Sequence, residues 1–325
     1  MSKKKVLVCG ATGFIGRNTA EHLANREDFE VYGTYLNSKP FDNPDIEMVK
    51  ADLVDRDQAY KVVEGKDIII QAAAISTGAK DVIENPYIHV TDNVRINSLV
   101  FEAAHVNGES HVLFPSCTVM YQSSDKPIRE EDFDPREGMA PRYAGGGDMK
   151  VFSEKLCEFY AGLGDTKFTA FRHSNIYGTH DKMGLKNLER SHVFAATITK
   201  VMEAKEGDSI LVWGTGEEER DLLYVSDLTS FVEKAIDNQS TGFELVNVGL
   251  GESISVSGLV KKIIDISGKN LEIEYDPSKP TIPTKVALEC TKAKDRFGWS
   301  PQHTLDEGIQ KTIDWYVKNR KSFGS

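Results

Sequence analysis

The stretch Lys5-Val6-Leu7-Val8-Cys9-Gly10-Ala11-Thr12-Gly13-Phe14-Ile15-Gly16 decides the fold of this chain. An apolar run leads into three glycines and then into a helix-like segment, which is the pattern of a strand, a tight turn and a helix. Such glycines permit the turn, let the backbone approach a pyrophosphate and let the helix pack closely on the strand. N–H groups at the amino end of the helix can bind the phosphates. We therefore predict a dinucleotide site rather than a purely structural turn, with contacts from Gly10, Thr12, Gly13, Phe14, Ile15 and Gly16.

Apolar runs alternate with helix-length segments through residues 1–177. The runs show no polar alternation, which is typical of strands that helices cover on both faces. Strands and helices in alternation predict βαβ units and a parallel sheet. The expected strands are residues 5–9, 30–34, 47–49, 67–71, 111–114 and 167–171, and the expected long helices are residues 93–106 and 151–163.

After residue 177 the pattern loosens. We expect a loop over residues 178–191, a helix over 193–204, and strands over 210–213, 244–248 and 271–275. The last helix has a clear start, because Thr304 can cap it and Glu307 completes a capping box. The expected fold class is α/β: a Rossmann doubly wound parallel sheet in residues 1–177, followed by a smaller carboxy-terminal α/β substrate lobe. That lobe is mainly residues 178–325, and the division allows the chain to cross back into the first domain.

The composition limits the classes of function. A formal net charge of −11 argues against non-specific binding to nucleic acid or to an anionic membrane, which needs clustered positive charge. No apolar stretch approaches the ~18–20 residues that cross a bilayer. The cysteines lie far apart, at Cys9, Cys117, Cys157 and Cys290, so neither a disulfide framework nor a metal site is suggested. We expect a cytoplasmic protein.

Two further segments extend the expected cofactor site. Asp52 and Leu53 follow the third strand, where Asp52 could accept a hydrogen bond from an adenine amino group. The fourth strand ends in small side chains that let a dinucleotide lie against the backbone, although alanines also simply pack. These are Ala72, Ala73 and Ala74.

The second strand ends without the acidic residue that would bind a ribose 2′-hydroxyl. Tyr35, Asn37, Ser38 and Lys39 stand there, with Arg17 nearby in the first helix. Because no carboxylate would repel a 2′-phosphate, the sequence favours NADP over NAD as the cofactor.

Three later segments are more specific. They are Arg172-His173-Ser174-Asn175-Ile176-Tyr177-Gly178-Thr179-His180-Asp181, Arg190-Ser191-His192-Val193, and Trp213-Gly214-Thr215-Gly216 running on to Glu219-Arg220-Asp221-Leu222-Leu223-Tyr224-Val225-Ser226-Asp227. With the glycine motif, they resemble the extended short-chain dehydrogenase/reductase family, the NAD-dependent epimerases and dehydratases. Within that family they are similar to the GDP-L-fucose synthase-like nucleotide-sugar epimerases and reductases. The resemblance covers residues 5–315.

The resemblance implies roles for five residues of a nucleotide-sugar site. Arg220 matches an arginine placed on the nucleotide phosphates, which a guanidinium suits because it donates two parallel charge-assisted bonds. Asn175 matches an asparagine of the sugar-nucleotide pocket, and His192 matches a histidine that serves as an acid in epimerisation. Trp213 and Lys285 match base and phosphate contacts. The plainer alternatives are an ion pair between Arg220 and the adjacent aspartate, and an ordinary surface histidine.

Members of the family move a proton with a tyrosine whose pKa is lowered by a lysine four residues on. In Arg142-Tyr143-Ala144-Gly145-Gly146-Gly147-Asp148-Met149-Lys150 the lysine is Lys150, and Gly146 stands where the tyrosine would. The other register takes Tyr143 as the tyrosine, but it mismatches the helix beyond. Cys117 stands where the family has a Ser or Thr hydroxyl. A thiol is a weak donor, so either Thr118 substitutes or this contact is weakened.

Three glycines in a row cost a helix ~1 kcal/mol each relative to alanine. We therefore expect a loop at residues 145–147, with Asp148 capping a helix that begins later. A loop there leaves room for Tyr143 to swing inward. Tyr143 and His192 rank first as replacements for the missing tyrosine, ahead of Cys117 and water.

Two classes of function remain. The first is an NAD(P)-dependent oxidoreductase or epimerase acting at C4, or at C3 and C5, of a nucleotide-linked sugar, with GDP-hexose or GDP-heptose first among the candidates. The alternative is a non-catalytic dinucleotide-binding regulator or an inactive partner subunit, which the loss of the tyrosine favours. The resemblance also implies a homodimer in which helices 93–106 and 151–163 pair across the axis.

Overall fold

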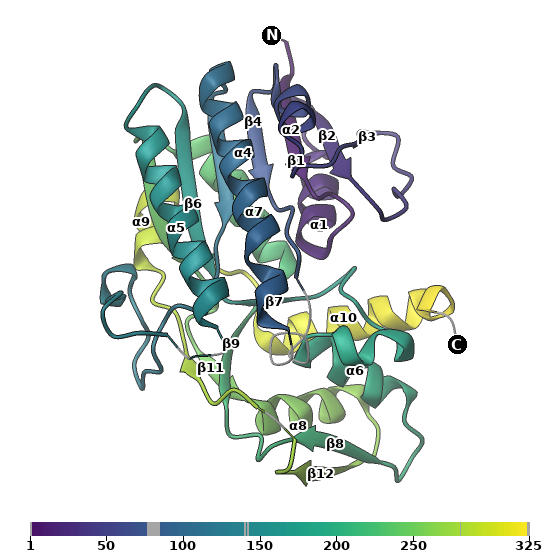
Figure 1. The fold of residues 1–325 in the computed structure, drawn as a ribbon. Helices are drawn as coiled ribbons and strands as arrows, with labels where there is room; N and C mark the ends of the chain where they lie inside the picture. The colour runs from purple at the N-terminus through teal and green to yellow at the C-terminus, as the bar shows by residue number, and fades with distance from the viewer. Residues whose placement is uncertain (1, 77–84, 140, 142, 280, 324–325) are drawn as a thin grey trace.

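The computed structural model describes residues 2–76, 85–139, 141, 143–279 and 281–323. Figure 1 shows a layered α/β body with a smaller lobe packed below it. Within the described residues, no helix is both long enough and apolar enough to span a bilayer.

Seven parallel strands form the large sheet, and they confirm the predicted Rossmann class. They are β1 (Lys4–Cys9), β2 (Phe29–Tyr35), β3 (Ile46–Lys50), β4 (Ile68–Gln71), β5 (His111–Pro115), β6 (Lys167–His173) and β10 (Phe243–Val248). Their order is β10-β6-β5-β4-β1-β2-β3, so the winding reverses between β1 and β4. Ligands of open α/β sheets bind beyond the carboxyl ends of the strands at this switch point.

Helices cover both faces of the large sheet with apolar side chains. On one face the core is shared with α1 (Phe14–Leu23), α7 (Val225–Asn238) and α9 (Thr291–Phe297). On the other face it is shared with α2 (Arg56–Val63), α4 (Thr91–Asn107) and α5 (Ala144–Ala161). This double coverage explains why the strand sequences are continuously apolar.

The smaller lobe has its own core and two small sheets. One sheet contains β7 (Asn175–Tyr177), β9 (Glu219–Tyr224), β11 (Ser253–Ser255) and β13 (Lys285–Val286), and the other pairs β8 (Ser209–Trp213) with β12 (Glu272–Asp276). Helices α6 (Val193–Glu203), α8 (Val256–Ser267) and α10 (Leu305–Asn319) pack around them (Figure 1). Short 3₁₀ turns are η1 (Pro86–His89), η2 (Glu130–Asp132), η3 (Leu185–Arg190) and η4 (Arg320–Phe323).

The start of α10 confirms the predicted capping box. The Glu307 backbone N–H donates to Thr304 Oγ1 at 3.3 Å, and the Thr304 backbone N–H donates to Glu307 Oε2 at 2.8 Å. This local signal was readable because both partners lie within one helical turn.

The expectation of a loop at residues 145–147 is wrong. Helix α5 begins at Ala144 with Tyr143 as its N-cap residue, and the Gly147 N–H donates to the Tyr143 carbonyl at 2.7 Å. Packing outweighs the poor helix propensity, because Gly147 is buried and a Cβ there would lie 2.2 Å from the sulfur of Met139. Tertiary contacts routinely override a propensity cost of ~1 kcal/mol per glycine.

Candidate functional site

The glycine turn lies at the switch point and is shaped by backbone. Gly10 has a φ of +71°, and a Cβ on it would lie 2.6 Å from Ala73 Cα at the end of β4. A Cβ on Gly16 would lie 2.3 Å from the Gly10 carbonyl oxygen. The Gly10 N–H donates to Thr34 Oγ1 at 2.8 Å, which fixes the turn against β2. Only glycine fits this close approach of turn, helix and strand.

The amino end of α1 is open to a ligand. Gly13 is the N-cap residue and carries no side-chain cap, so the first N–H groups of the helix point beyond its end. Thr12, Phe14 and Ile15 surround this end and are half-buried. Unpaired helix N–H groups beside closely approaching backbone fit a pyrophosphate, so the residues present suit a dinucleotide.

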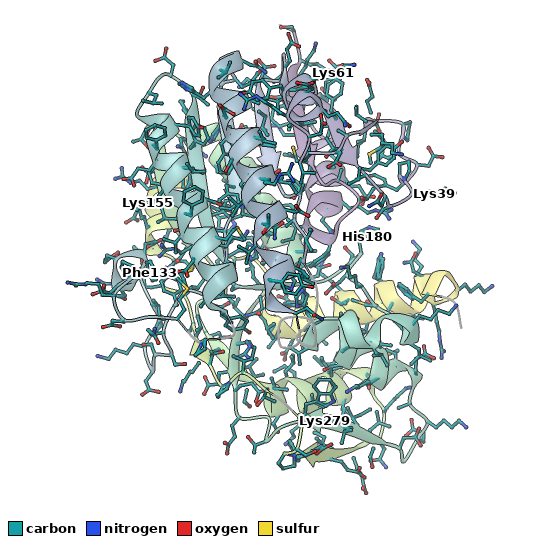
Figure 2. The ribbon with its side chains drawn as sticks, viewed as in Figure 1. Lys39, Lys61, Phe133, Lys155, His180 and Lys279 are labelled. Atoms are coloured by element: carbon teal, nitrogen blue, oxygen red, sulfur yellow. The ribbon has the colours of Figure 1, made fainter. Side chains whose placement is uncertain are left out.

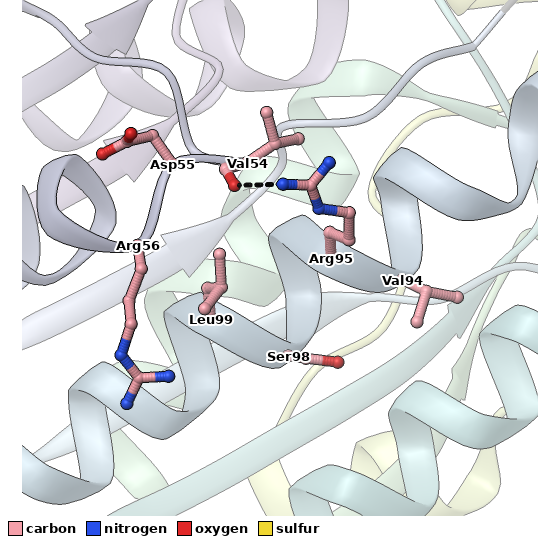
Figure 3. Close-up of a pocket in the computed structure, with 7 residues that line it drawn as sticks. All are labelled: Val54, Asp55, Arg56, Val94, Arg95, Ser98 and Leu99. Carbon is pink, nitrogen blue, oxygen red and sulfur yellow. Dashed lines mark hydrogen bonds between the residues drawn. The ribbon is translucent and has the colours of Figure 1, made fainter.

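The adenine end follows β3 and β4. Asp52 Oδ1 accepts the Val54 N–H at 3.1 Å, and Leu53 is buried in the core below. Ala72 to Ala74 become steadily more exposed as the chain leaves β4. The next residues, Val54 to Arg56, line a surface cavity of about 420 Å³ together with α4. In this cavity the Arg95 guanidinium donates a hydrogen bond to the Val54 carbonyl at 3.0 Å (Figure 3).

The loop after β2 lies beside α1. The guanidinium of Arg17 is 4.6 Å from the centre of the Phe41 ring and donates to Glu21 at 2.9 Å. Tyr35, Asn37 and Ser38 come from the start of this loop, and Lys39 projects outward at its edge (Figure 2). Arg17 and this loop are therefore neighbours, as a 2′-phosphate site would require.

Lys150 lies at the end of β5. Its ammonium donates to the Pro115 carbonyl at 2.8 Å and lies 4.6 Å over the Phe114 ring. Burial lowers the pKa of Lys150, while the nearby thiol of Cys117 and the carboxylate of Glu154 act in the opposite direction. Burial raises the pKa of Cys117, and the Lys150 charge opposes that shift. The two predicted catalytic residues are thus electrostatic neighbours. Thr118 follows, half-buried.

A buried polar network fixes this strand end, and sequence reasoning missed it. Glu154 lies one helical turn beyond Lys150; it accepts the Ser116 hydroxyl at 2.5 Å and the Arg172 guanidinium at 2.7 Å. Arg172 also donates to the Tyr121 hydroxyl at 3.0 Å. The only sequence signal was an arginine within an otherwise apolar strand. The network ties α5 and β5 to β6.

Tyr143 faces the same region as Lys150. The two are seven residues apart, which is about two turns of helix and places them on one side of α5. Burial raises the pKa of Tyr143, the Arg220 charge lowers it and the Cys117 thiol raises it further. Between them, a Cβ on Gly146 would have no atom of the described residues within 4 Å. The charges of Arg220 and Cys117 therefore both act on the Tyr143 hydroxyl, and position 146 has room for a side chain.

Arg220 is held by backbone rather than by an acid. Its guanidinium donates to the Thr284 carbonyl at 2.9 Å and hydroxyl at 2.6 Å, and to the Ile282 carbonyl at 3.0 Å. The alternative of an ion pair with Asp221 is wrong, because the carboxylate of Asp221 is buried beneath and accepts three backbone N–H groups. These come from Leu250, Gly251 and Leu288. A cavity of about 380 Å³ opens beside Arg220, between β9, β11, α8 and the start of α10.

The other predicted substrate residues differ in their exposure and in the partners that they already have. The Asn175 amide is exposed and donates to the Asp221 carbonyl at 3.2 Å. Trp213 is partly exposed, with the Lys279 ammonium 6.0 Å from its ring. Lys285 is paired with Asp125 at 3.2 Å and with Glu219 at 3.1 Å, so a phosphate would have to compete with two carboxylates for its charge.

His192 is exposed and is the N-cap residue of α6, where its side chain makes no capping bond. Its charge acts on two buried groups, His173 at the end of β6 and Asp181 in the loop after β7. Burial lowers the pKa of His173 to about 4, and the charges of Lys150 and His192 add to that shift. The structure thus gathers His192, His173 and Lys150 into one electrostatic group.

Comparisons with known proteins give a consistent result. The model of a family described as "NAD dependent epimerase/dehydratase family" matches residues 6–249. The chain is 29% identical to GDP-L-colitose synthase of Yersinia pseudotuberculosis, covering 98% of this chain and 99% of that protein. It is 25% identical to GDP-L-fucose synthase of Escherichia coli, covering 99% of both. Its fold matches a UDP-glucose 4-epimerase of Thermotoga maritima, crystallised with UDP-glucose, with a TM-score of 0.84 and 23% identity over 97% of this chain and 99% of that one.

Proposed function

Because the chain belongs to the NAD dependent epimerase/dehydratase family, we propose that it is an NADP-dependent reductase or epimerase acting at C4 of a GDP-linked hexose or heptose. Residues 1–177 would hold the coenzyme, and residues 178–325 would mainly hold the nucleotide sugar. The GDP moiety is supported by the two GDP-sugar synthases named above, each of which aligns over nearly all of this chain.

The proposal depends on the position of Tyr143. Its hydroxyl shares a side of α5 with Lys150 and lies near the Cys117 thiol and the Arg220 guanidinium. We infer that Tyr143 takes over the work of the tyrosine that Gly146 replaces, reaching from one helical turn earlier across the glycines. The three glycines at residues 145–147 support this, since no side chain on those positions would obstruct the phenol.

The proton path follows from these positions. When bound, the coenzyme would supply or accept a hydride at the sugar carbon. Tyr143 would give its proton to the sugar oxygen during reduction, and the positive charge of Lys150 would stabilise the phenolate that remains. Arg220 would hold the diphosphate. His192 would protonate carbon at C3 or C5 if epimerisation accompanies reduction.

The preference for NADP is supported by Arg17. Its guanidinium lies against the loop that follows β2, where a 2′-phosphate would be placed, and that strand ends without a carboxylate. Titration of the purified protein with NADPH and NADH in parallel tests the preference. Equal affinity, or tighter binding of NADH, would contradict it.

A homodimer is supported by the outer side of α5. Phe152 and Phe159 are seven residues apart on one side of the helix and are 47% and 56% exposed. Leu163 beyond the helix and Val106 on the adjacent α4 are 54% and 62% exposed. We propose that a second copy covers this apolar strip. Light scattering of wild type and of Phe159→Glu tests it, with a dimer expected to become a monomer.

The alternative function, a non-catalytic regulator in the cytoplasm, is favoured by Gly146 and Cys117 together. A single experiment separates the two. The protein is incubated with NADPH and a GDP-4-keto-hexose, the loss of reduced nicotinamide is followed optically, and the product is identified by NMR. A UDP-4-keto-hexose serves as the comparison. Turnover with the GDP sugar supports the enzyme, whereas tight coenzyme binding without turnover of either sugar would support the regulator.

A further inference from the structure

The loop after β7 is fixed from both sides. The His180 imidazole is 3.2 Å from a carboxylate oxygen of Glu21 on α1, and its ring centre lies 5.1 Å from that of Trp315 on α10. Two bonds tie the next residues to α6: Ser191 Oγ donates to the Lys182 carbonyl at 2.5 Å, and the Gly184 N–H donates to Thr199 Oγ1 at 3.0 Å. Asp181 and His192, each next to a residue of the first bond, are therefore held close together.

Asp181 carries a buried oxygen that no group satisfies. The residue is 6% exposed, and its Oδ1 accepts the Lys182 N–H at 2.7 Å. Its Oδ2 is fully covered and has no hydrogen-bond partner among the residues that the structure describes. A buried carboxylate oxygen without a partner is costly, of the order of 1–3 kcal/mol, so such an atom calls for an explanation. Burial raises the pKa of Asp181, and the charge of His192 is the largest influence that lowers it.

We propose that Asp181 is a positioning residue for His192: its free Oδ2 accepts a hydrogen bond from the imidazole N–H when the exposed His192 ring rotates toward it. This fixes one ring tautomer and stabilises the imidazolium from which the proton is delivered. Asp181 itself neither gains nor loses a proton in the step. The inference rests on the proposed function, because it assigns His192 its proton-donating work.

Several basic groups lie in the same cluster as His192 and Asp181. Among the described groups whose charges bear on this cluster, His173 on β6, Lys150 on α5 and Lys182 in the loop are basic. Each would oppose a second positive charge nearby if protonated, although the pKa of His173, lowered to about 4, keeps it neutral at neutral pH. Asp181 is the acidic group that can offset the charge on His192.

The test uses the full-length protein with ¹⁵N-labelled histidine and needs no substrate or coenzyme. Imidazole spectra of wild type and Asp181→Asn are recorded across a pH series, and His192→Gln identifies the His192 signals. The expected result is a change in the His192 tautomer and a smaller protonated fraction at each pH. The internal control is His303, whose Nδ1 is 2.8 Å from Asp227 Oδ1 and should be unaffected. Superimposable His192 titrations would overturn the proposal.

A second measurement covers the case in which Asp181→Asn does not fold. The ¹³C signal of the Asp181 carboxyl is titrated in wild type and in His192→Gln. Loss of the neighbouring charge should raise the pKa of Asp181 further, and an unchanged midpoint would contradict the pairing. If turnover is established, Asp181→Asn should lower kcat roughly 10- to 100-fold with little change in KM, which is part of the ~10²–10⁴ that general acid catalysis supplies. Failure of the proposed function would remove turnover only and leave both titrations intact.

Discussion

The two ends of the cleft use glycine in opposite ways. At the coenzyme end, a Cβ on Gly10 or Gly16 would lie within 2.6 Å of backbone atoms. At the reactive end, a Cβ on Gly146 would have no described atom within 4 Å. The first glycines allow backbone to come close to backbone, whereas position 146 has room for a side chain that the sequence does not place there.

This difference separates what is rigid in the molecule from what can change. The coenzyme end is built from main chain, so almost any substitution there disturbs the fold itself. The proposed reactive end depends on the side chains of Tyr143, Lys150 and Cys117, which can be exchanged while the backbone beneath them persists. A family of enzymes can therefore alter its proton chemistry without altering its coenzyme site.

Replacing Tyr143 by Phe should give the largest effect. If its hydroxyl moves the proton, kcat should fall by ~10²–10⁴, the usual contribution of a general acid or base. Coenzyme affinity, measured by fluorescence titration, should stay the same because the ring remains. The double variant Tyr143→Phe with Gly146→Tyr should recover part of the rate, since position 146 has room. Full activity in Tyr143→Phe alone would show that the Tyr143 hydroxyl does not transfer the proton.

The proposed reactive end should also contribute to the sensitivity to acid, through His173. Its folded pKa of about 4 is below the unfolded value of 6.5, so the unfolded chain binds a proton first as the pH falls. The stability that the neutral ring contributes is fully present above the pKa of the unfolded state. It is lost as the pH falls toward the pKa of the folded state, and the loss in free energy of unfolding reaches about 3 kcal/mol. The free energy of unfolding, measured with urea across a pH series, should fall less steeply toward low pH in His173→Gln than in wild type. Parallel acid limbs would contradict the shift.

Gly16→Ala tests the coenzyme end. The added methyl would lie 2.3 Å from the Gly10 carbonyl oxygen, and backbone on both sides leaves it nowhere to move. We expect the free energy of unfolding to fall by ~1–3 kcal/mol, as overpacking usually costs, together with weaker coenzyme binding. Calorimetry and coenzyme titration measure the two. Unchanged values would show that the turn is looser than its close contacts indicate.

Gly146→Ala should have the smallest effect, and of the opposite sign. A methyl enters open space within a helix, so stability should rise by ~1 kcal/mol, the propensity difference between glycine and alanine. The matched control is Gly147→Ala, one residue on, where the methyl meets the Met139 sulfur at 2.2 Å and should destabilise. Equal changes in the free energy of unfolding for the two variants would contradict the difference between open Gly146 and crowded Gly147.

The sequence predicted the parts of the fold that are encoded locally. The predicted strand at residues 5–9 and the capping box at Thr304 fall where the structure has them, because each depends on neighbours within a turn or a strand. Of the strands in the small lobe, β8 and β12 were predicted, whereas β7, β11 and β13 were missed because two or three residues are too few to show a periodic pattern. The helix through residues 145–147 was missed because the packing of Met139 against Gly147 comes from tertiary structure.

The candidate site shows the same limit. Motif spacing indicated Lys150 and Cys117, and the structure places them side by side. Nothing local could indicate that Glu154 would pair with Arg172, or that Asp181 would be buried with one free oxygen, because those partners meet only after the chain has folded. Buried polar groups are set by three-dimensional neighbours, which no periodicity records.

The placement of β10 at the edge of the large sheet, beside β6, constrains how this protein can be synthesised and divided. A nascent chain cannot complete its large sheet until residue 248 has left the ribosome. The first 177 residues therefore cannot finish folding before β10 has been synthesised. A fragment that stops at residue 177 would present the bare edge of β6, which invites pairing with other chains. Separate expression of the two halves should therefore give aggregates, and any split version of the protein should be cut in a surface loop beyond β10.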